Sequence, residues 1–237
     1  MPTMSRADGA GAALLRWAAQ RAASTSPALV DLSLEPARIE LSGRVLVNWW
    51  AKNAGLLDAE WGIGPGSRVA VQAPAHWRVL PLVLAALSLG AQVGPADLED
   101  ADLLITTDPA SPEAAAHPEV LAVTTAALAV SFGAPLPAGV VDHAAEVRAY
   151  PDRLLAQPGQ ADAAAWEHDG EELTLGELLA GGEDGEGAAL EVPAQAGLLA
   201  ALTALLRSGA AGSVVLAPEG GLSERLRAQE RVTRSLA

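Results

Sequence analysis

Side chains that could bind a ligand lie where expected strands run into turns or helices. His76 and Arg78 lie where an expected strand, Arg68–Gln72, leads into an apolar helix. Ligands of open α/β sheets bind at that end of the strands, and helix N-termini attract anions. Thr106 and Thr107 follow another expected strand and could bind phosphate. These four residues are the candidate ligand-binding residues of the chain.

Each candidate also has a purely structural interpretation, which the sequence favours. His76 and Arg78 would face solvent on either side of a buried Trp77, since the start of one helix is a weak signal. Thr106 and Thr107 begin a Thr-Thr-Asp-Pro segment, which is typical of a turn with a local cap.

Other common chemistries have less support. An acidic run could hold Mg²⁺, although such a run is more often a solvated loop: Asp97, Glu99, Asp100 and Asp102. The four histidines lack the spacing of zinc ligands: His76, His117, His143 and His168. The absence of cysteine excludes a thiolate nucleophile, and no Gly-x-Ser-x-Gly motif supports a hydrolase. We therefore predict no catalytic residue and no metal site.

Composition and charge narrow the class of protein. Hydrophobic residues make up 50% of the 237 residues and charged residues 19%, which is typical of a globular chain. The net charge is −14 and Lys52 is the single lysine, so binding to nucleic acid or to an anionic membrane is not expected. Met1–Gly9 has no apolar signal core, and the apolar run Val79–Leu89 is too short to span a bilayer. We expect a soluble, cytoplasmic protein.

The first part of the chain alternates between strand and helix patterns. The patterns predict a helix at 11–21, a hairpin from 29–34 and 38–41, a Ser42-capped helix that ends at Gly62, a strand at 68–72, a helix at about 77–89 with Pro81 in its first turn, and strands at 91–93 and 102–106. A strand at 120–124 and a helix at 141–148 follow. This alternation predicts an α/β fold with doubly wound, mainly parallel sheets and helices on both faces.

The second part repeats this order in shorter form. The patterns predict a hairpin at 166–173 with an Asp-Gly turn, a helix begun by the capping box of Thr174 and Glu177, a strand at 188–192, a helix at 198–207, a strand at 213–216 and a charged helix at 223–231. We therefore expect two related lobes, at 1–150 and 161–237, joined by a linker at 151–160, with the second lobe as an internal repeat of the first.

A resemblance to a known superfamily lies within residues 28–94. The segments that carry it are Ile39–Ser42 before the capped helix, Gly64–Val71, Pro74–Trp77 and Leu89–Ala91. Together they resemble the opening of adenylate-forming (AMP-binding) enzymes such as acyl-CoA synthetases, although Ser67 stands where that family usually has Asp. The layout also resembles short, uncharacterised bacterial proteins related to this superfamily.

The resemblance implies ATP, an organic acid and an acyl-adenylate, but the corresponding motifs are missing. The family's phosphate loop is rich in Ser, Thr and Gly and ends in Lys; Thr106–Pro109 has neither Gly nor Lys, and Gly181–Gly187 carries three carboxylates that would repel phosphate. The only tyrosine, Tyr150, does not lie in a Tyr-Gly-x-Thr-Glu motif. ATP or AMP is thus expected by resemblance only, and no catalytic residue can be carried over.

Three functions stay open at this point. The first is a degenerate relative of AMP-forming acid ligases, inactive alone, with a residual nucleotide or acyl site. The second is an interaction or regulatory module that binds another protein. The third is a subunit of a split ligase whose phosphate loop comes from a partner chain.

Overall fold

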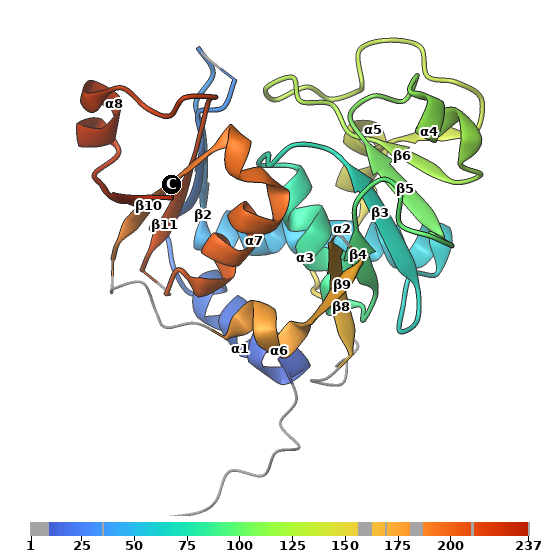
Figure 1. Ribbon diagram of the computed structural model, residues 1–237, viewed down its shortest axis with the longest axis horizontal. Helices are drawn as coiled ribbons and strands as arrows, with labels where there is room; N and C mark the ends of the chain where they lie inside the picture. Colours follow the sequence, from blue (N-terminus) through green and yellow to red (C-terminus); the bar gives the residue numbers. More distant parts are fainter. Residues whose placement is uncertain are drawn as a thin grey trace, which may run out of the picture.

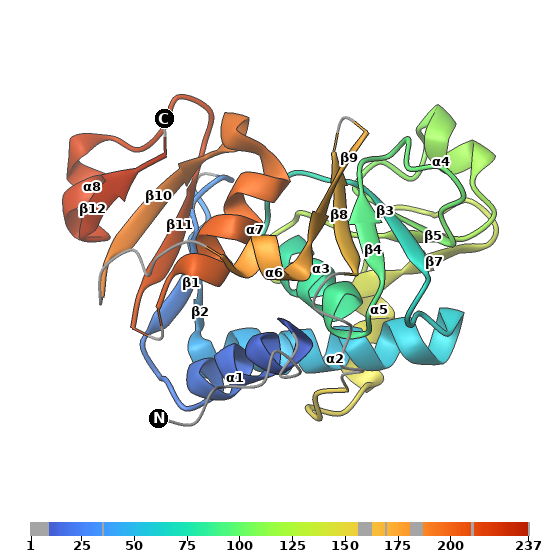
Figure 2. The ribbon, with the colours of Figure 1, turned by 60° about the horizontal axis from the view of Figure 1, so that its bottom comes forward.

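The computed structural model describes residues 10–34, 36–155, 163–168, 170–180, 187–209 and 211–236. Two mixed sheets lie side by side with helices between them and outside them (Figures 1 and 2). Sheet A has five described strands, in the spatial order β12 (Val232–Ser235), β10 (Ala189–Pro193), β11 (Ser213–Ala217), β1 (Pro27–Asp31) and β2 (Ile39–Ser42). All its neighbouring strands are parallel except β1 and β2.

Sheet B is built on the same plan. It has seven described strands, in the order β7 (Val140–Asp142), β6 (Val120–Ala122), β5 (Leu103–Thr106), β3 (Arg68–Gln72), β4 (Gln92–Gly94), β8 (Ala164–His168) and β9 (Glu171–Thr174). Its strands are parallel except for the hairpin of β8 and β9. The predicted α/β class, with mainly parallel sheets, is confirmed.

The helices fill the space between the sheets and cover their outer faces. The inner helices are α2 (Gly43–Trp61), α3 (Val79–Ser88) and α7 (Gly197–Arg207), with α1 (Ala10–Ala22) and α6 (Leu175–Leu179) packed beside them. The outer helices are α8 (Glu224–Gln229) on sheet A and α4 (Pro112–Ala116) on sheet B. The short α5 (His143–Glu146) follows β7.

Alternation along the strands explains these layers. Leu29 of β1 faces the central core, whereas Val30 belongs to the outer cluster beneath α8. In sheet B, Val69 faces the central core and Ala70 belongs to the outer cluster beneath α4. Strands buried on both faces have to be apolar at nearly every position, which is why these segments read as continuous aliphatic runs.

Local sequence signals set the ends of the inner helices. The Ser42 side chain accepts a hydrogen bond from the amide of Val45, and α2 ends at Gly62 in a left-handed conformation with φ 61°. Pro81 is the third residue of α3, where its missing N–H leaves no helical hydrogen bond unmade. The capping box of Thr174 and Glu177 starts α6 as predicted.

Each of the two hairpins pairs with the sheet whose other strands come from the opposite half of the chain. The β1–β2 hairpin precedes the strands of sheet B in sequence but pairs with β11 of sheet A. Reciprocally, the β8–β9 hairpin precedes β10, β11 and β12 of sheet A but pairs with β4 of sheet B. Each hairpin covers a strand, β11 or β4, that would otherwise be an exposed sheet edge. The sheets therefore do not divide at 151–160, where the sequence suggested a boundary between lobes.

Several elements differ from the sequence predictions. The helix predicted at 141–148 begins later, because Val140–Asp142 forms the edge strand β7. The helix predicted at 223–231 ends at Gln229, and β12 follows it. The short α4 was not predicted. The Asp-Gly turn at 169–170, the linker at 151–160 and the glycine-rich segment at 181–187 lie partly outside the described residues.

Candidate functional site

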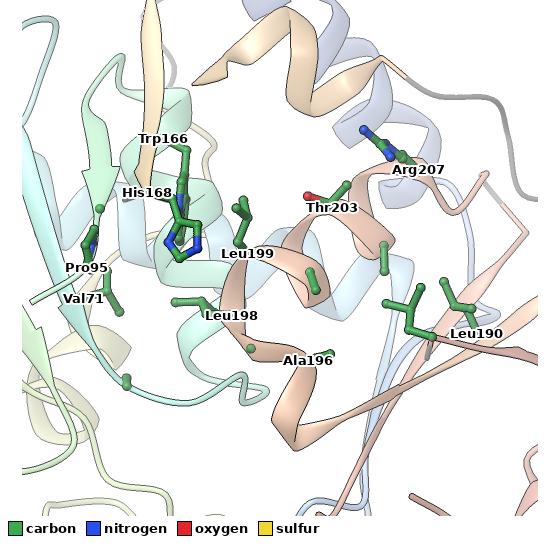
Figure 3. Close-up of a pocket in the computed structure, with 16 residues that line it drawn as sticks. Val71, Pro95, Trp166, His168, Leu190, Ala196, Leu198, Leu199, Thr203 and Arg207 are labelled. Carbon is green, nitrogen blue, oxygen red and sulfur yellow. The ribbon is translucent and has the colours of Figure 1, made fainter. Parts of the chain in front are cut away.

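A cavity of about 550 Å³ runs along α7 between the two sheets and is called the α7 cavity below. Val71, Gly94 and His168, at or near the carboxyl ends of the neighbouring strands β3, β4 and β8, line one side of it. Figure 3 shows Trp166 and His168 on this side, with Leu198 and Leu199 projecting toward them from α7. The cavity thus lies at the strand ends where ligands of parallel sheets bind.

The lining of the α7 cavity is mostly apolar. Of the sixteen described residues that line it, three have polar side chains: His168, Thr203 and Arg207. No aspartate or glutamate is among the sixteen. A cavity of this size with a few polar groups is typical of a site for a small organic molecule.

The chain differs in residue size near the starts of α3 and α7. Ser88 ends α3 and Ser208 directly follows α7, and each hydroxyl donates to the carbonyl oxygen three residues earlier. Counting back equally far from these serines leads to Gly197, the first residue of α7, and to Trp77, which lies two residues before α3. A Cβ added to Gly197 would meet no atom within 4 Å. At these two positions the first half of the chain carries an indole, and the second half carries no side chain.

Two N–H groups of the lining residues lack an acceptor among the described residues. Trp166 is 4% exposed, and its Nε1 makes no hydrogen bond. The Nε of Arg207 is also buried without a partner, and an Nη2 of the same side chain lies 3.5 Å from the carbonyl oxygen of Glu177. Buried donors without acceptors cost free energy unless a water or a ligand satisfies them.

The predicted candidates His76 and Arg78 lie elsewhere, and the expectation that they face solvent is wrong. His76 is 1% exposed and Arg78 is 2% exposed. They are buried because Asp31, from the end of β1, approaches the start of α3 and accepts a hydrogen bond from the amide of Trp77 at 2.9 Å. The sequence could not indicate this contact, since Asp31 belongs to the other sheet.

The surroundings of His76 and Arg78 favour a structural role. Burial lowers the pKa of His76, although Asp31, 3.7 Å from its Nε2, opposes the shift. The guanidinium of Arg78 lies 4.2 Å from the centroid of the Trp77 ring and donates to the carbonyl oxygen of Ala129 at 2.8 Å. Burial lowers the pKa of Arg78 to about 10. The space beside His76 is only about 10 Å³, the size of one water molecule.

A second buried histidine was not singled out by the sequence. His143 is 0% exposed, and its Nε2 donates to Oδ1 of Asn53 at 2.8 Å. Burial, together with the charges of Arg78 and His76, lowers the pKa of His143 to about 3. No signal in the sequence marks this pair, because α2 and α5 meet only in the folded chain.

The candidates Thr106 and Thr107 belong to a turn, which agrees with the structural interpretation. The Thr106 hydroxyl donates to Oε1 of Gln72 at 2.8 Å and accepts from the amide of Asp108. Ser111 donates to the same Gln72 oxygen and caps α4. The Thr107 amide donates to the backbone of Gln72. These bonds hold the loop to β3 and use the polar groups that phosphate would need.

The remaining candidates are not gathered into a site. Among the described residues, no group of three or more His, Asp or Glu is placed to hold a metal ion. Lys52 lies on α2, where its Nζ contacts Asp152 at 2.7 Å and the carbonyl oxygen of Tyr150 at 2.6 Å. In the described part of the chain, none of the helices has both the length and the apolar character needed to cross a bilayer.

Comparisons with solved structures identify the fold. The N-terminal domain of FACL13 from Mycobacterium tuberculosis superposes with a TM-score of 0.68 at 19% identity, over 97% of this chain and 62% of that one. Acetoacetyl-CoA synthetase from Streptomyces lividans superposes with a TM-score of 0.74 at 15% identity, over 96% and 42%. The chain thus has the fold of the N-terminal region of acyl-CoA synthetases and spans about half the length of such proteins. The predicted resemblance is confirmed.

Comparison of sequences gives a more specific result. No protein-family model matches the chain. A TIGR03089 family protein of Mycobacterium tuberculosis is 34% identical over 213 residues, which cover 84% of this chain and 86% of the relative. The relative therefore matches this chain along most of its own length. Because the identity extends over most of both sequences, the chain belongs to the TIGR03089 family.

Proposed function

We propose that the chain is a non-catalytic relative of adenylate-forming enzymes that holds a small, largely apolar molecule in the α7 cavity. The observation that carries this proposal is the cavity itself, about 550 Å³ in volume with three polar side chains among sixteen lining residues. Open space at Gly197 provides room for a ligand, whereas the segment before α3 carries the indole of Trp77 at the position equally far from Ser88. The relatives with this fold include acyl-CoA and acetoacetyl-CoA synthetases, whose names point to organic acids.

The absence of adenylation is part of the proposal. A triphosphate needs a cradle of backbone amides and a positive charge. The single lysine of the chain, Lys52, is already engaged by Asp152 and the Tyr150 backbone. The glycine-rich segment 181–187 contains three carboxylates. Thr106 uses its hydroxyl within its own turn.

Titration with a neutral apolar fluorophore tests the binding function. We expect N-phenyl-1-naphthylamine to bind in a 1:1 complex with increased emission. Ala200 lines the cavity, so Ala200→Phe would occupy part of it and weaken binding at least tenfold. Ala59→Phe, at an exposed position of α2, is the matched control and would leave binding unchanged. Equal binding by the two variants would place the fluorophore outside the α7 cavity.

Nucleotide tests address the catalytic half of the proposal. We expect no thermal shift of the protein with ATP at millimolar concentration. A ligand present at a hundred times its Kd would add about 2.7 kcal/mol to the free energy of unfolding. We also expect no pyrophosphate release from ATP in the presence of a mixture of carboxylic acids. Pyrophosphate release by the purified chain would refute the non-catalytic assignment and leave the binding assignment to be judged by the fluorophore.

A second candidate function is an interaction with another protein, and one loop favours it. Leu128 is 74% exposed and Val130 is 58% exposed in the loop that follows β6. Arg78 and Arg148 hold this loop through the carbonyl oxygens of Ala129 and Val130. Fixed, exposed apolar side chains suit a protein contact. Capture from native lysate that is lost with Leu128→Ser but kept with Ala200→Phe would support this function.

A further inference from the structure

We propose that residues 125–132, called the strap below, form an acid-sensitive cover over His76 that opens while the rest of the chain stays folded. The strap lies in the connection between β6 and β7 and contains no helix or strand. None of its residues lines the α7 cavity, so the device is separate from the proposed ligand site.

Polar contacts, rather than buried side chains, hold the strap closed. None of the residues 125–132 is buried. The Nη2 of Arg78 donates to the carbonyl oxygen of Ala129 at 2.8 Å. Arg148 donates to the next carbonyl oxygen of the strap at 3.0 Å, and the amide of Phe132 donates to Oδ2 of Asp142 at 2.7 Å. A segment with few buried contacts can open locally at a free energy well below that of global unfolding.

The closed strap covers a buried histidine that has an unsatisfied donor. Thr125 and Ala127 line the space of about 10 Å³ beside His76. Nδ1 of His76 accepts from the amide of Arg78 at 3.3 Å, so the neutral ring carries its proton on Nε2. This Nε2 is buried and makes no hydrogen bond, with Oδ2 of Asp31 3.7 Å away. Opening of the strap would let water accept a hydrogen bond from Nε2.

The backbone of Leu128 adds a second cost to the closed form. Its φ of 54° lies in the left-handed region, which is uncommon for residues other than glycine. The Leu128 side chain is 74% exposed, so packing does not offset this strain. The closed strap is therefore held by a few hydrogen bonds and opposed by a strained residue and an unpaired donor.

Acid favours the open form because of the groups that face His76. Burial lowers the pKa of His76 and the charge of Arg78 lowers it further, whereas Asp31 and the backbone of Thr125 oppose the shift. His143, on α5, also faces Arg78 and His76, but it does not line the space under the strap. The strap itself carries no charged residue. Opening therefore hydrates one titrating group, His76.

Proton linkage gives the sign and size of the effect. In the closed form His76 stays neutral at pH values where a hydrated imidazole, with a pKa of about 6.5, takes up a proton. The closed form is thus fully favoured above pH 6.5 and loses stability as the pH falls. Uptake of one proton on opening raises the opening constant by up to tenfold per pH unit.

Amide hydrogen exchange, followed residue by residue by NMR, measures this opening. The Phe132 amide reports on the strap, and the Leu104 amide, which donates to the carbonyl oxygen of Glu119, reports on the core. After correction for the intrinsic exchange rate at each pH, we expect the opening constant at Phe132 to rise about tenfold from pH 6.5 to 5. At each pH the opening constant at Leu104 would stay at least a hundredfold smaller.

Three variants test the roles of the residues. His76→Gln, which does not titrate, would reduce the rise at Phe132 to less than twofold. His117→Gln is the matched control: it removes a histidine that contacts the carbonyl oxygen of Ala101, and would keep the tenfold rise. Arg148→Met removes one of the contacts that hold the strap, and would raise the opening constant at least threefold at every pH without changing its pH dependence.

Each contrary outcome would overturn the inference. These outcomes are a pH-independent opening constant at Phe132 in the unmodified protein, equal opening constants at Phe132 and Leu104, and a tenfold rise that survives His76→Gln. If His76→Gln does not fold, the unmodified protein and Arg148→Met carry the test. In that case, exchange at Phe132 that is no faster in Arg148→Met would overturn the inference, because the strap would not be held as described.

Discussion

The guanidinium of Arg21 donates hydrogen bonds to both the carbonyl oxygen and the hydroxyl of Ser208, 187 residues further along the chain. It also donates to the carbonyl oxygen of Gly212 at 2.6 Å. The equivalent Ser88 accepts its hydrogen bond from the indole of Trp50 instead. The two halves thus use the same serine position to tie a neighbouring helix to the end of α3 or α7. In the second half, the tie depends on a buried cation.

Replacement of Arg21 by methionine tests the strength of this tie. Methionine would fill the space but leave the carbonyl oxygens of Ser208 and Gly212 without these donors. Because each buried polar group left unsatisfied costs about 1–3 kcal/mol, we expect the free energy of unfolding to fall by about 2–4 kcal/mol. Urea denaturation measures the change. Arg16→Met, at an exposed position of the same helix, would change stability by less than about 0.5 kcal/mol.

Gly43, the first residue of α2, lies too close to the backbone of Arg21 to carry a side chain. A Cβ on Gly43 would collide with the backbone carbonyl oxygen of Arg21, which cannot move as a flexible side chain can. At an unhindered helical position, Gly→Ala stabilises by about 0.5–1 kcal/mol. For Gly43→Ala we expect the opposite sign, a loss of about 1–3 kcal/mol measured by urea denaturation. A stabilised variant would show that α1 and α2 can separate at no cost.

The fold was predictable from sequence wherever the signal was local. Ser42 and Gly62 set the ends of α2, and aliphatic runs located the strands that were predicted to within three residues at each end. The sheet assignment was not predictable in this way, because β1 pairs with β11 across almost the whole chain. Short strands such as β7 and β12 lack a period long enough to be recognised.

The cavity was harder to predict than the fold because it depends on space left open by small side chains. His76 and Arg78 drew attention as chemically capable residues, yet Asp31 and Trp77 enclose them. A useful signal lies in the similar order of elements in the two halves. Aligning the two halves at Ser88 and Ser208 sets Trp77 against Gly197 and so marks the missing volume. That alignment is justified only by knowing that Ser88 ends one helix and that Ser208 follows the other.

Acid sensitivity below pH 4.5 is expected from Glu191. This carboxylate is 1% exposed; burial alone would raise its pKa, but hydrogen bonds from Arg227, Ser235 and the Leu222 amide outweigh burial and lower it to about 2. Its stabilisation is therefore complete above the ordinary value of 4.5 and is lost as the pH falls from 4.5 toward 2. We expect this loss to reach about 2–3 kcal/mol.

Glu191→Gln separates this contribution from other acid effects. The variant would be less stable than the unmodified protein at pH 7 by about 2 kcal/mol, since the ion pair with Arg227 is lost. Between pH 4.5 and 2.5, its urea midpoint would fall less steeply than that of the unmodified protein. Parallel pH profiles would mean that Glu191 titrates alike in the folded and unfolded chains.

His143 is expected to set a separate acid transition at higher pH. Burial first, and then the charges of Arg78 and His76, lower its pKa to about 3, against about 6.5 in an unfolded chain. The unfolded state therefore binds a proton that the folded state does not, and stability falls by up to about 1.4 kcal/mol per pH unit between 6.5 and 3. His143→Gln would retain a donor for Asn53 but would not titrate. We expect the slope of its unfolding free energy from pH 6.5 to 5, where Glu191 does not yet contribute, to be smaller than that of the unmodified protein, with the rest of the slope due to His76, whose pKa burial also lowers. An unchanged slope in His143→Gln would assign the transition to another group, and His76→Gln would then identify whether the neighbouring imidazole is responsible.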